Sequence, residues 1–270
     1  MSSANDVTVS GDPQGAGTDY LLRVIDEIEK IPQIKKYRKK SYDFLEPLTG
    51  KSFLDAGCGS GSALCELASL GGNTSQMHGL DIRRGLLEEA ARRAETARVK
   101  IRLTQGSVAD LPFDSENFDG IRCERTVSHL QSPIAVIKEF VRVLKPAGKL
   151  VVIDVDADTA FISPGNLNVT RRMVSSLADN GMSLTVGRDL PGLFKMCGLV
   201  DISAESFVIP HSYELFKSLY EKTVLEAISR EGSASEVGVW WEALKEADDA
   251  GLFFMGVTAT LVSGTKGLPS

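Results

Sequence analysis

The residues best suited to chemistry form a glycine-rich turn between an apolar strand and a helix. The sequence FLDAGCGSG covers residues 53–61. Glycines allow a ligand close to the backbone, and a helix N-terminus offers free N–H groups to a polar or negative group. Asp81 stands at the end of the next apolar strand, where its carboxylate can accept both hydroxyls of an adenosine ribose. Together the turn and the acid predict an adenosine site.

The turn also restricts the kind of nucleotide. Dinucleotide sites usually have the spacing Gly-x-Gly-x-x-Gly, and here the third glycine, Gly61, comes one residue early. Asp55 stands just before the turn, where a carboxylate would repel a pyrophosphate but would bind an ammonium group, for example through water. The ligand that this pattern predicts is an adenosine with a positively charged amino group.

Five segments of the chain resemble motifs of the class I S-adenosylmethionine (SAM) dependent methyltransferases. Residues 54–61 are similar to the first motif of that family, residues 79–81 to its ribose-binding segment, and residues 105–113 to the segment beside the adenine. Residues 118–130 resemble its fourth strand with the following loop, and residues 142–148 its turn into the fifth strand. The resemblance covers residues 20–264 and is closest to the ubiquinone-biosynthesis type, which acts on small molecules.

The resemblance implies a set of residues that bind SAM. Ile82 is expected to pack on the adenine, and Glu124 lies where the family contacts the methionine end of the cofactor. Ser107 stands where the family usually has Asp, so Asp110 or a backbone carbonyl is the expected partner of the adenine amino group. The full expected set is Asp55, Gly57, Cys58, Gly59, Gly61, Asp81, Ile82, Ser107, Val108 and Glu124.

Two residues near strand ends are candidates for catalysis. His129 lies just past the expected fourth strand, at the sheet edge where open α/β folds bind ligands. Asp154 and Asp156 end the fifth strand on one face, so we expect at least one of them to reach the cleft, where a carboxylate can take a proton. We select His129 and Asp156. The alternatives are a histidine that caps the next helix and a solvated aspartate.

The elements that position these residues follow from hydrophobic periodicity. Strands alternate with helices, which is typical of a parallel sheet with right-handed crossovers. The expected strands are 52–56, 77–80, 99–104, 118–123, 149–155, 200–208 and 253–263, with the last antiparallel, and the expected helices between them are 60–70, 84–97, 132–144 and 188–197. The predicted fold is α/β: a Rossmann-like, seven-stranded, mostly parallel sheet with helices on both faces.

Segments outside this alternation predict how the chain is organised. Residues 1–18 are expected to be a flexible tail, and residues 19–48 two helices that form a lid with its hinge at Pro32 and with Tyr20 or Tyr37 near the ligand. Residues 49–264 are the expected SAM-binding domain. Helical cap insertions are expected near 157–187 and 211–250, and residues 265–270 are expected to be a second tail.

Composition narrows the class of protein and its partners. The formal charge is −6, which disfavours broad nucleic-acid binding, and the basic run at residues 35–40 is expected to be a solvated helix face. No apolar run reaches the length of a membrane span, so we expect neither membrane nor nucleic acid as a partner. Four cysteines without paired spacing, and no leader-like start, predict reduced thiols in a cytoplasmic monomer or homodimer. No metal-binding motif is present, so no metal is expected.

The expected function is therefore methyl transfer from SAM to a small-molecule acceptor, an N, O, S or C nucleophile, of the kind found in secondary metabolism. Positioning of the acceptor in line with the methyl group is expected to dominate the mechanism. The alternative is a protein that binds SAM on the same scaffold as a cyclase or a regulatory binder, because a fold does not fix its chemistry.

Overall fold

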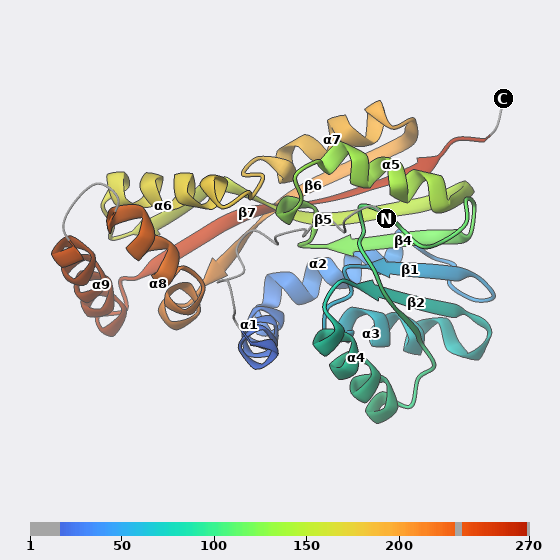
Figure 1. Cartoon of the computed structure of the whole chain (residues 1–270), viewed down its shortest axis with the longest axis horizontal. Helices are drawn as coiled ribbons and strands as arrows, with labels where there is room; N and C mark the ends of the chain where they lie inside the picture. Colours follow the sequence, from blue (N-terminus) through green and yellow to red (C-terminus); the bar gives the residue numbers. More distant parts are fainter. Residues whose placement is uncertain (1–16, 230–233, 269–270) are drawn as a thin grey trace, which may run out of the picture.

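The computed structural model describes residues 17–229 and 234–268. Of the tails expected at residues 1–18 and 265–270, residues 1–16 and 269–270 lie outside the described residues, whereas Thr18 begins the first helix and residues 265–266 belong to the last strand. After two N-terminal helices, the chain alternates strands and helices as far as β3, which is followed directly by β4 (Figure 1). The helices are α1 Thr18–Lys30, α2 Pro32–Asp43, α3 Ser62–Gly71, α4 Arg84–Ala97, α5 Pro133–Val143, α6 Leu167–Asp179, α7 Val186–Met196, α8 Tyr213–Ser229 and α9 Ala234–Asp249, with short 3-10 helices η1 Gly72–Thr74 and η2 Val127–His129. The strands are β1 Ser52–Ala56, β2 Gln76–Asp81, β3 Arg102–Gln105, β4 Phe118–Glu124, β5 Leu144–Ser163, β6 Leu199–His211 and β7 Phe254–Lys266.

These strands form one seven-stranded sheet in the order β3-β2-β1-β4-β5-β7-β6. The five strands from β3 to β5 are parallel, and β7 is antiparallel to both β5 and β6. The predicted seven-stranded, mostly parallel fold with an antiparallel last strand is therefore confirmed. Because parallel strands end at the same edge, the carboxyl ends of β1, β2 and β4 meet where the glycine turn begins.

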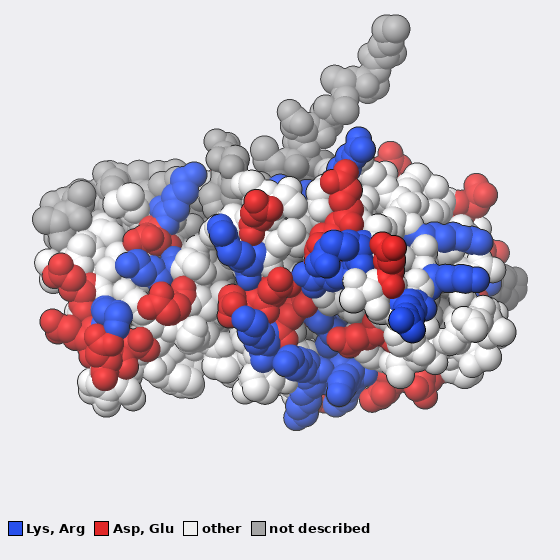
Figure 2. Space-filling view, turned by 90° about the horizontal axis from the view of Figure 1, so that it is seen from below, with Lys and Arg blue, Asp and Glu red and all other residues white. Residues whose placement is uncertain are grey.

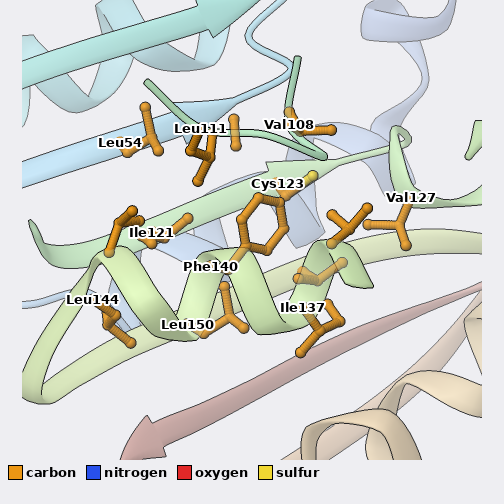
Figure 3. Close-up of a cluster of buried hydrophobic side chains, with 14 of the residues drawn as sticks. Leu54, Val108, Leu111, Ile121, Cys123, Val127, Ile137, Phe140, Leu144 and Leu150 are labelled. Atoms are coloured by element: carbon orange, nitrogen blue, oxygen red, sulfur yellow. The ribbon is translucent and has the colours of Figure 1, made fainter. Parts of the chain in front are cut away.

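Helices cover both faces of the sheet (Figure 1). On one face, α5 and α7 pack over β4 and β5 through a fully buried core that includes Phe140, Ile137, Phe118 and Phe194. Figure 3 shows part of this core, with Phe140 between α5 and the β4 residues Ile121 and Cys123. On the other face α2 and α3 bury a second apolar cluster. Such cores hold the strand ends, and with them the turn, in fixed positions.

The segment after Asp156 is where the sequence prediction was wrong in part. A helical insertion was expected from residue 157, but β5 continues to Ser163 and pairs with β7 after a register shift between Asp156 and Phe161. The extension is stabilised by its pairing with β7 and by partly buried side chains: Phe161 packs on Phe254, with ring centroids 5.1 Å apart, and Ile162 packs against the cap core. β7 also continues two residues past the expected boundary, to Lys266.

The extended β5 and β7 carry a helical cap made of α6, α8 and α9, which lies at one end of the molecule (Figure 1). Its core joins α8, α9 and the strand ends through tilted and edge-on aromatic contacts, with Trp241 and Phe216 5.3 Å apart between centroids. Trp240 and Trp241 therefore serve packing in the cap. No helix in the described residues is long and apolar enough to cross a membrane.

The basic run at residues 35–40 forms part of α2 and is not a uniformly solvated face. Tyr37 and Arg38 are buried, because Tyr37 stacks on Phe207 and Arg38 pairs with two carboxylates inside the protein. Figure 2 shows that positive and negative side chains are interspersed on the face turned to the viewer. The prediction of a solvated helix face was therefore wrong for Tyr37 and Arg38, because sequence spacing did not reveal the carboxylates that pair with Arg38.

Candidate functional site

A cavity of about 370 Å³ lies at the carboxyl edge of the parallel strands, between the sheet, α1 and the cap. Residues from the ends of β1, β2, β4, β5 and β6 line it. From the expected set the cavity is lined by Asp55, Gly57, Cys58, Gly59, Asp81, Ile82, Ser107, Val108, Glu124 and His129, and it is not lined by Gly61 or Asp156.

The glycine turn has the conformation that its sequence requires. Gly57, Gly59 and Gly61 all have positive φ, at 74°, 53° and 78°. A Cβ on Gly57 would lie 2.3 Å from Thr126 Oγ1, and one on Gly61 would lie 2.7 Å from Ala90 Cβ. At Gly59 the nearest atom would be Ile25 Cδ1 of α1, 3.8 Å away across the cavity. Gly57 and Gly61 thus allow close packing, whereas Gly59 keeps the backbone open to a ligand.

Asp81 is fixed beside the turn by backbone N–H groups. Gly59 N donates to Oδ2 and Arg83 N donates to Oδ1, each at 2.9 Å. Each carboxylate oxygen retains a second lone pair, so the group can still accept two hydroxyl protons. Burial raises the pKa of Asp81, while these N–H donors oppose the rise.

Asp55 lies under the turn in a buried ion pair. Arg122 Nη1 donates to Asp55 Oδ1 at 3.1 Å, and both side chains are 2% exposed. Asp55 Oδ2 is buried and, within the described residues, accepts no hydrogen bond. Burial raises the pKa of Asp55, and the charge of Arg122 works against the rise. An unpartnered buried carboxylate oxygen is costly, which favours a cationic or N–H donor ligand at this point.

The ion pair extends through Glu124 to the two N-terminal helices. Arg122 Nη2 donates to Glu124 Oε2, and Arg38 Nε of α2 lies 3.3 Å from the same oxygen. Arg38 Nη2 also donates to Glu29 Oε1 of α1 at 3.2 Å. Burial alone would raise the pKa of Glu124, but the guanidinium groups of Arg122 and Arg38 hold it well below its ordinary value. The network therefore ties α1 and α2 to the floor of the cavity.

The expected adenine side of the cavity is mainly apolar. Val108 is buried, whereas Ile82 is 40% exposed and lines the cavity. Ser107 Oγ accepts from Ala109 N at 3.2 Å, and Ser107 forms an isolated bridge with Asp110. Asp110 does not line the cavity, whereas the backbone at Gly106 and Ser107 does, so the backbone is the better placed of the two expected partners.

His129 is held at the cavity by the loop after β4. Asp154 Oδ2 accepts from Thr126 N and from Ser128 N, both at 3.1 Å, and His129 N donates to Thr126 O at 3.1 Å. Asp154 is fully buried below this loop. It therefore shapes the loop that carries His129, and it does not reach the cavity itself.

The structure does not bring Asp156 to the cavity. Its carboxylate is 3% exposed and accepts two hydrogen bonds from Arg188 of α7, the Nη2 bond being 2.6 Å long. The residues of β5 that line the cavity are Val155 and Ala157, which have the opposite parity. The expectation that Asp154 or Asp156 would reach the cleft was wrong, because periodicity shows which residues share a face and not which face is turned to the site.

Arg125 and His211 also line the cavity, although the sequence did not single out His211. His211 ends β6, and its Nδ1 lies 3.2 Å from Ile209 O. One signal was available: Phe207, Ile209 and His211 alternate, so a buried face would carry the histidine with it. Arg125 has a φ of 53°, which is uncommon outside glycine and occurs often at functional sites.

The helix α1 lies along the open side of the cavity and contacts both α4 and α8. Its apolar residues Leu21, Val24, Ile25 and Ile28 line the cavity, yet no residue of α1 is buried. Tyr20 donates to Ser218 O, and Tyr37 donates to Glu205 Oε1 at 2.8 Å. Neither tyrosine lines the cavity, contrary to the expectation for these two residues.

The residues around the cavity fit a cationic adenosine compound such as SAM. The open backbone at Gly59 can lie against a ligand, and the free lone pairs of Asp81 can accept the ribose hydroxyls. The unpartnered Asp55 Oδ2 can accept a hydrogen bond from the ammonium group. In the described part of the chain, no group of three or more His, Cys, Asp or Glu side chains lies together as metal ligands would.

Comparison with known proteins agrees with this site. Residues 54–152 match the family described as "Methyltransferase domain". The chain is 31% identical over 163 residues to the demethylmenaquinone methyltransferase of Lactococcus lactis subsp. lactis, covering 59% of this chain and 63% of that protein. It is 30% identical over 188 residues to an uncharacterized 37.1 kDa protein in transposon TN4556 of Streptomyces fradiae, covering 66% and 53%. It thus spans between half and two thirds of the length of these relatives.

A solved structure shares the fold. The YcgJ protein from Bacillus subtilis superposes with a TM-score of 0.64 at 19% identity, covering 87% of this chain and 100% of that chain. At that identity the likeness speaks for the fold alone. The sequence matches identify residues 54–152 as a SAM-dependent methyltransferase domain, and the structural likeness shows that the chain has the fold of this solved structure.

Proposed function

We propose that this protein transfers the methyl group of SAM to a small, largely apolar acceptor, such as a secondary metabolite, held between the sheet edge and the cap. One observation carries the proposal: a single cavity joins the glycine turn and Asp81 to apolar side chains of the cap. A donor and an acceptor can therefore meet in one enclosed space.

The proposed donor end is formed by the expected cofactor residues. Asp81 would accept the ribose hydroxyls, Asp55 the ammonium group, and the backbone at Gly59 would lie against the ligand. Ile82 and Val108 would pack on the adenine. When bound, SAM supplies a methyl group already activated by its sulfonium. The main task left to the protein is to bind, orient and exclude water.

The proposed acceptor end is apolar. The cap contributes Leu177, Met182, Leu219 and Tyr220, and the strands contribute Val155, Ala157, Ile209 and Val257. Burial of apolar acceptor surface against them would supply affinity of about 25 cal/mol per Å². His129 stands between the two ends, and we propose that it contacts the acceptor near the methyl group.

We further propose that α1 and α2 act as a lid over this space. The apolar stripe of α1 lines the cavity without being buried, so a bound ligand would complete its packing. Ile31 is extended between the two helices and precedes Pro32, which is the point where the segment can bend.

Release of S-adenosylhomocysteine (SAH) tests the proposal. The purified protein is incubated with SAM and a panel of apolar phenols, amines, thiols and carbon nucleophiles, and SAH and methylated products are measured by mass spectrometry. Calorimetry with SAH follows for the wild type, Asp81→Ala and Asp43→Ala, the last being an exposed aspartate outside the cavity. D81A loses two hydrogen bonds to a charged group, so we expect its SAH affinity to be more than 100-fold weaker than that of the wild type. The control D43A should keep the wild-type affinity.

SAH binding without turnover of any acceptor would contradict methyl transfer. It would favour the cyclase or regulatory-binder alternative. Wild-type SAH affinity in D81A would instead contradict the assignment of the donor end.

A further inference from the structure

The end of β6 delivers a histidine to the acceptor side of the cavity. Phe207 and Ile209 are buried on the face of β6 that also carries His211, and β6 pairs with β7 as far as His211 opposite Met255. His211 lines the cavity together with Ile209 and with Tyr220 of the cap. Its position is thus set by the part of β6 that is continuously paired with β7, residues 203–211, which is a more rigid support than a loop.

One hydrogen bond determines which nitrogen of His211 is available. Nδ1 lies 3.2 Å from Ile209 O, and a carbonyl oxygen only accepts, so the proton of the neutral ring is on Nδ1. The Nε2 lone pair is then the acceptor. Burial, together with the positive charge of Arg125, lowers the pKa of His211 to about 4, so the imidazole is neutral near pH 7.

The groups around His211 favour an acceptor without positive charge. Arg125 carries a positive charge that disfavours an ammonium beside His211, and its Nε lies 3.4 Å from Glu124 Oε1, with which it forms an ion pair. Burial raises the pKa of Tyr220 to about 12, so its phenol stays protonated. Of the other cap residues that line the cavity, Leu177 and Leu219 are apolar and Thr223 carries a hydroxyl. A hydroxyl group on an apolar body matches this set, because it can donate to Nε2 while its oxygen faces the Arg125 charge.

We propose that the acceptor is an apolar molecule bearing a phenol or enol hydroxyl, and that Nε2 of His211 takes the hydroxyl proton during O-methylation. This inference rests on the methyl transfer proposed above. The oxygen–methyl bond forms and the methyl–sulfur bond of the donor breaks, leaving its electron pair on sulfur. The O–H bond breaks, its pair stays on oxygen and the proton moves to Nε2, so SAH, the methyl ether and an imidazolium are formed.

The neutral imidazole is strong enough for this role. The acidity of the hydroxyl rises steeply as the oxygen begins to bond to carbon, so the proton can leave late to a weak base. For an acceptor that is already ionised, the positive charge of Arg125 would favour the phenolate oxygen before the methyl arrives. His211 would therefore touch the acceptor and act as a catalytic residue, whereas Arg125 would stabilise charge.

The test compares wild type, His211→Ala and His78→Gln. His78 is a matched control, because it stacks edge-on to Phe113 and Phe118 outside the cavity. The probes are alkylphenols and 4-nitrophenol, whose hydroxyl is already largely ionised near neutral pH. We expect H211A to lower kcat for alkylphenols about 100-fold, with SAH affinity unchanged by calorimetry, and H78Q to keep the wild-type rate.

Two readouts separate proton transfer from a structural role. The defect of H211A should shrink for 4-nitrophenol, which needs no base, and added imidazole should restore turnover of alkylphenols in H211A alone. A uniform loss across all phenols without rescue by imidazole, or wild-type kcat in H211A, would overturn the role of His211. If wild type releases SAH with amines, thiols or carbon nucleophiles and with no phenol, the hydroxyl class is wrong while methyl transfer stands. If no acceptor yields SAH, methyl transfer itself fails, and the inference fails with it.

Discussion

Arg122 and Asp55 form a buried ion pair directly beneath the glycine turn, with Nη1 of the arginine 3.1 Å from Oδ1 of the aspartate. The pair lies in the middle of a parallel sheet, where charges are rare. It is tolerated because every part of the guanidinium is used: Nε donates to Ser41 Oγ at 3.0 Å and Nη2 donates to Glu124. The arginine fixes one oxygen of Asp55 and leaves the other for a ligand.

The first prediction concerns this pair. Arg122→Met would leave Asp55 and Glu124 buried without their main counter-charge, so we expect the free energy of unfolding to fall by about 3–5 kcal/mol. Urea unfolding measures the change. The control is Arg102→Met, which removes an exposed arginine of β3 and should shift stability by less than about 0.5 kcal/mol. Equal stability of the two variants would show that Arg122 is not needed to balance the buried carboxylates.

The second prediction separates backbone strain from ligand access. Gly59→Val and Gly72→Val both place a β-branched residue at positive φ, 53° and 66°, so both variants should lose stability. Of these two glycines, Gly59 lines the cavity and Gly72 does not, and a Cβ on Gly72 would meet no atom within 4 Å. We expect G59V to lose SAH binding in calorimetry and G72V to retain it. Comparable affinities would mean that the cofactor does not lie against Gly59.

The third prediction concerns the lid. Because no residue of α1 is buried while four of its apolar side chains line the cavity, SAH should add contacts that slow local opening. At SAH 100-fold above its Kd, amide exchange in α1 should slow by up to about 100-fold if opening requires ligand release. Hydrogen exchange with mass spectrometry measures this, with peptides of α7 on the opposite face as the internal control. Unchanged exchange in α1 would show that α1 and α2 are a static helix pair and not a lid.

The fourth prediction is a pH dependence of stability. His211 has a pKa of about 4 in the folded protein and about 6.5 when unfolded, because burial disfavours its charged form. Between these values the unfolded chain binds more protons, so the contribution of His211 is complete above about pH 6.5 and is lost as the pH falls towards 4, by about 3 kcal/mol in total. Urea unfolding from pH 7 to pH 4.5 should therefore be less steeply pH-dependent in His211→Gln than in wild type. Parallel curves would show that His211 is not buried as a neutral ring.

The local parts of the fold and site follow from short stretches of sequence. The turn at residues 57–61 needs positive φ at three positions, and glycine adopts positive φ without strain. The glycine pattern therefore predicts the conformation of the turn. Asp81 is equally local, because the end of β2 must lie beside the end of β1 in a parallel sheet. The strands and helices up to α5 could also be predicted, because hydrophobic periodicity is a property of short stretches of sequence.

The tertiary structure decided which polar side chains share the cavity. Asp156 looked suitable at a strand end, yet Arg188, thirty-two residues away, holds it outside the site. His211 enters the cavity because β6 continues three residues past its expected end at residue 208 and stays paired with β7 as far as His211. Arg38 looked like a surface residue of the basic run, and only packing brought it to Glu124. Such pairings depend on strand length, register and the face turned inward, which long-range packing sets and local sequence patterns do not encode.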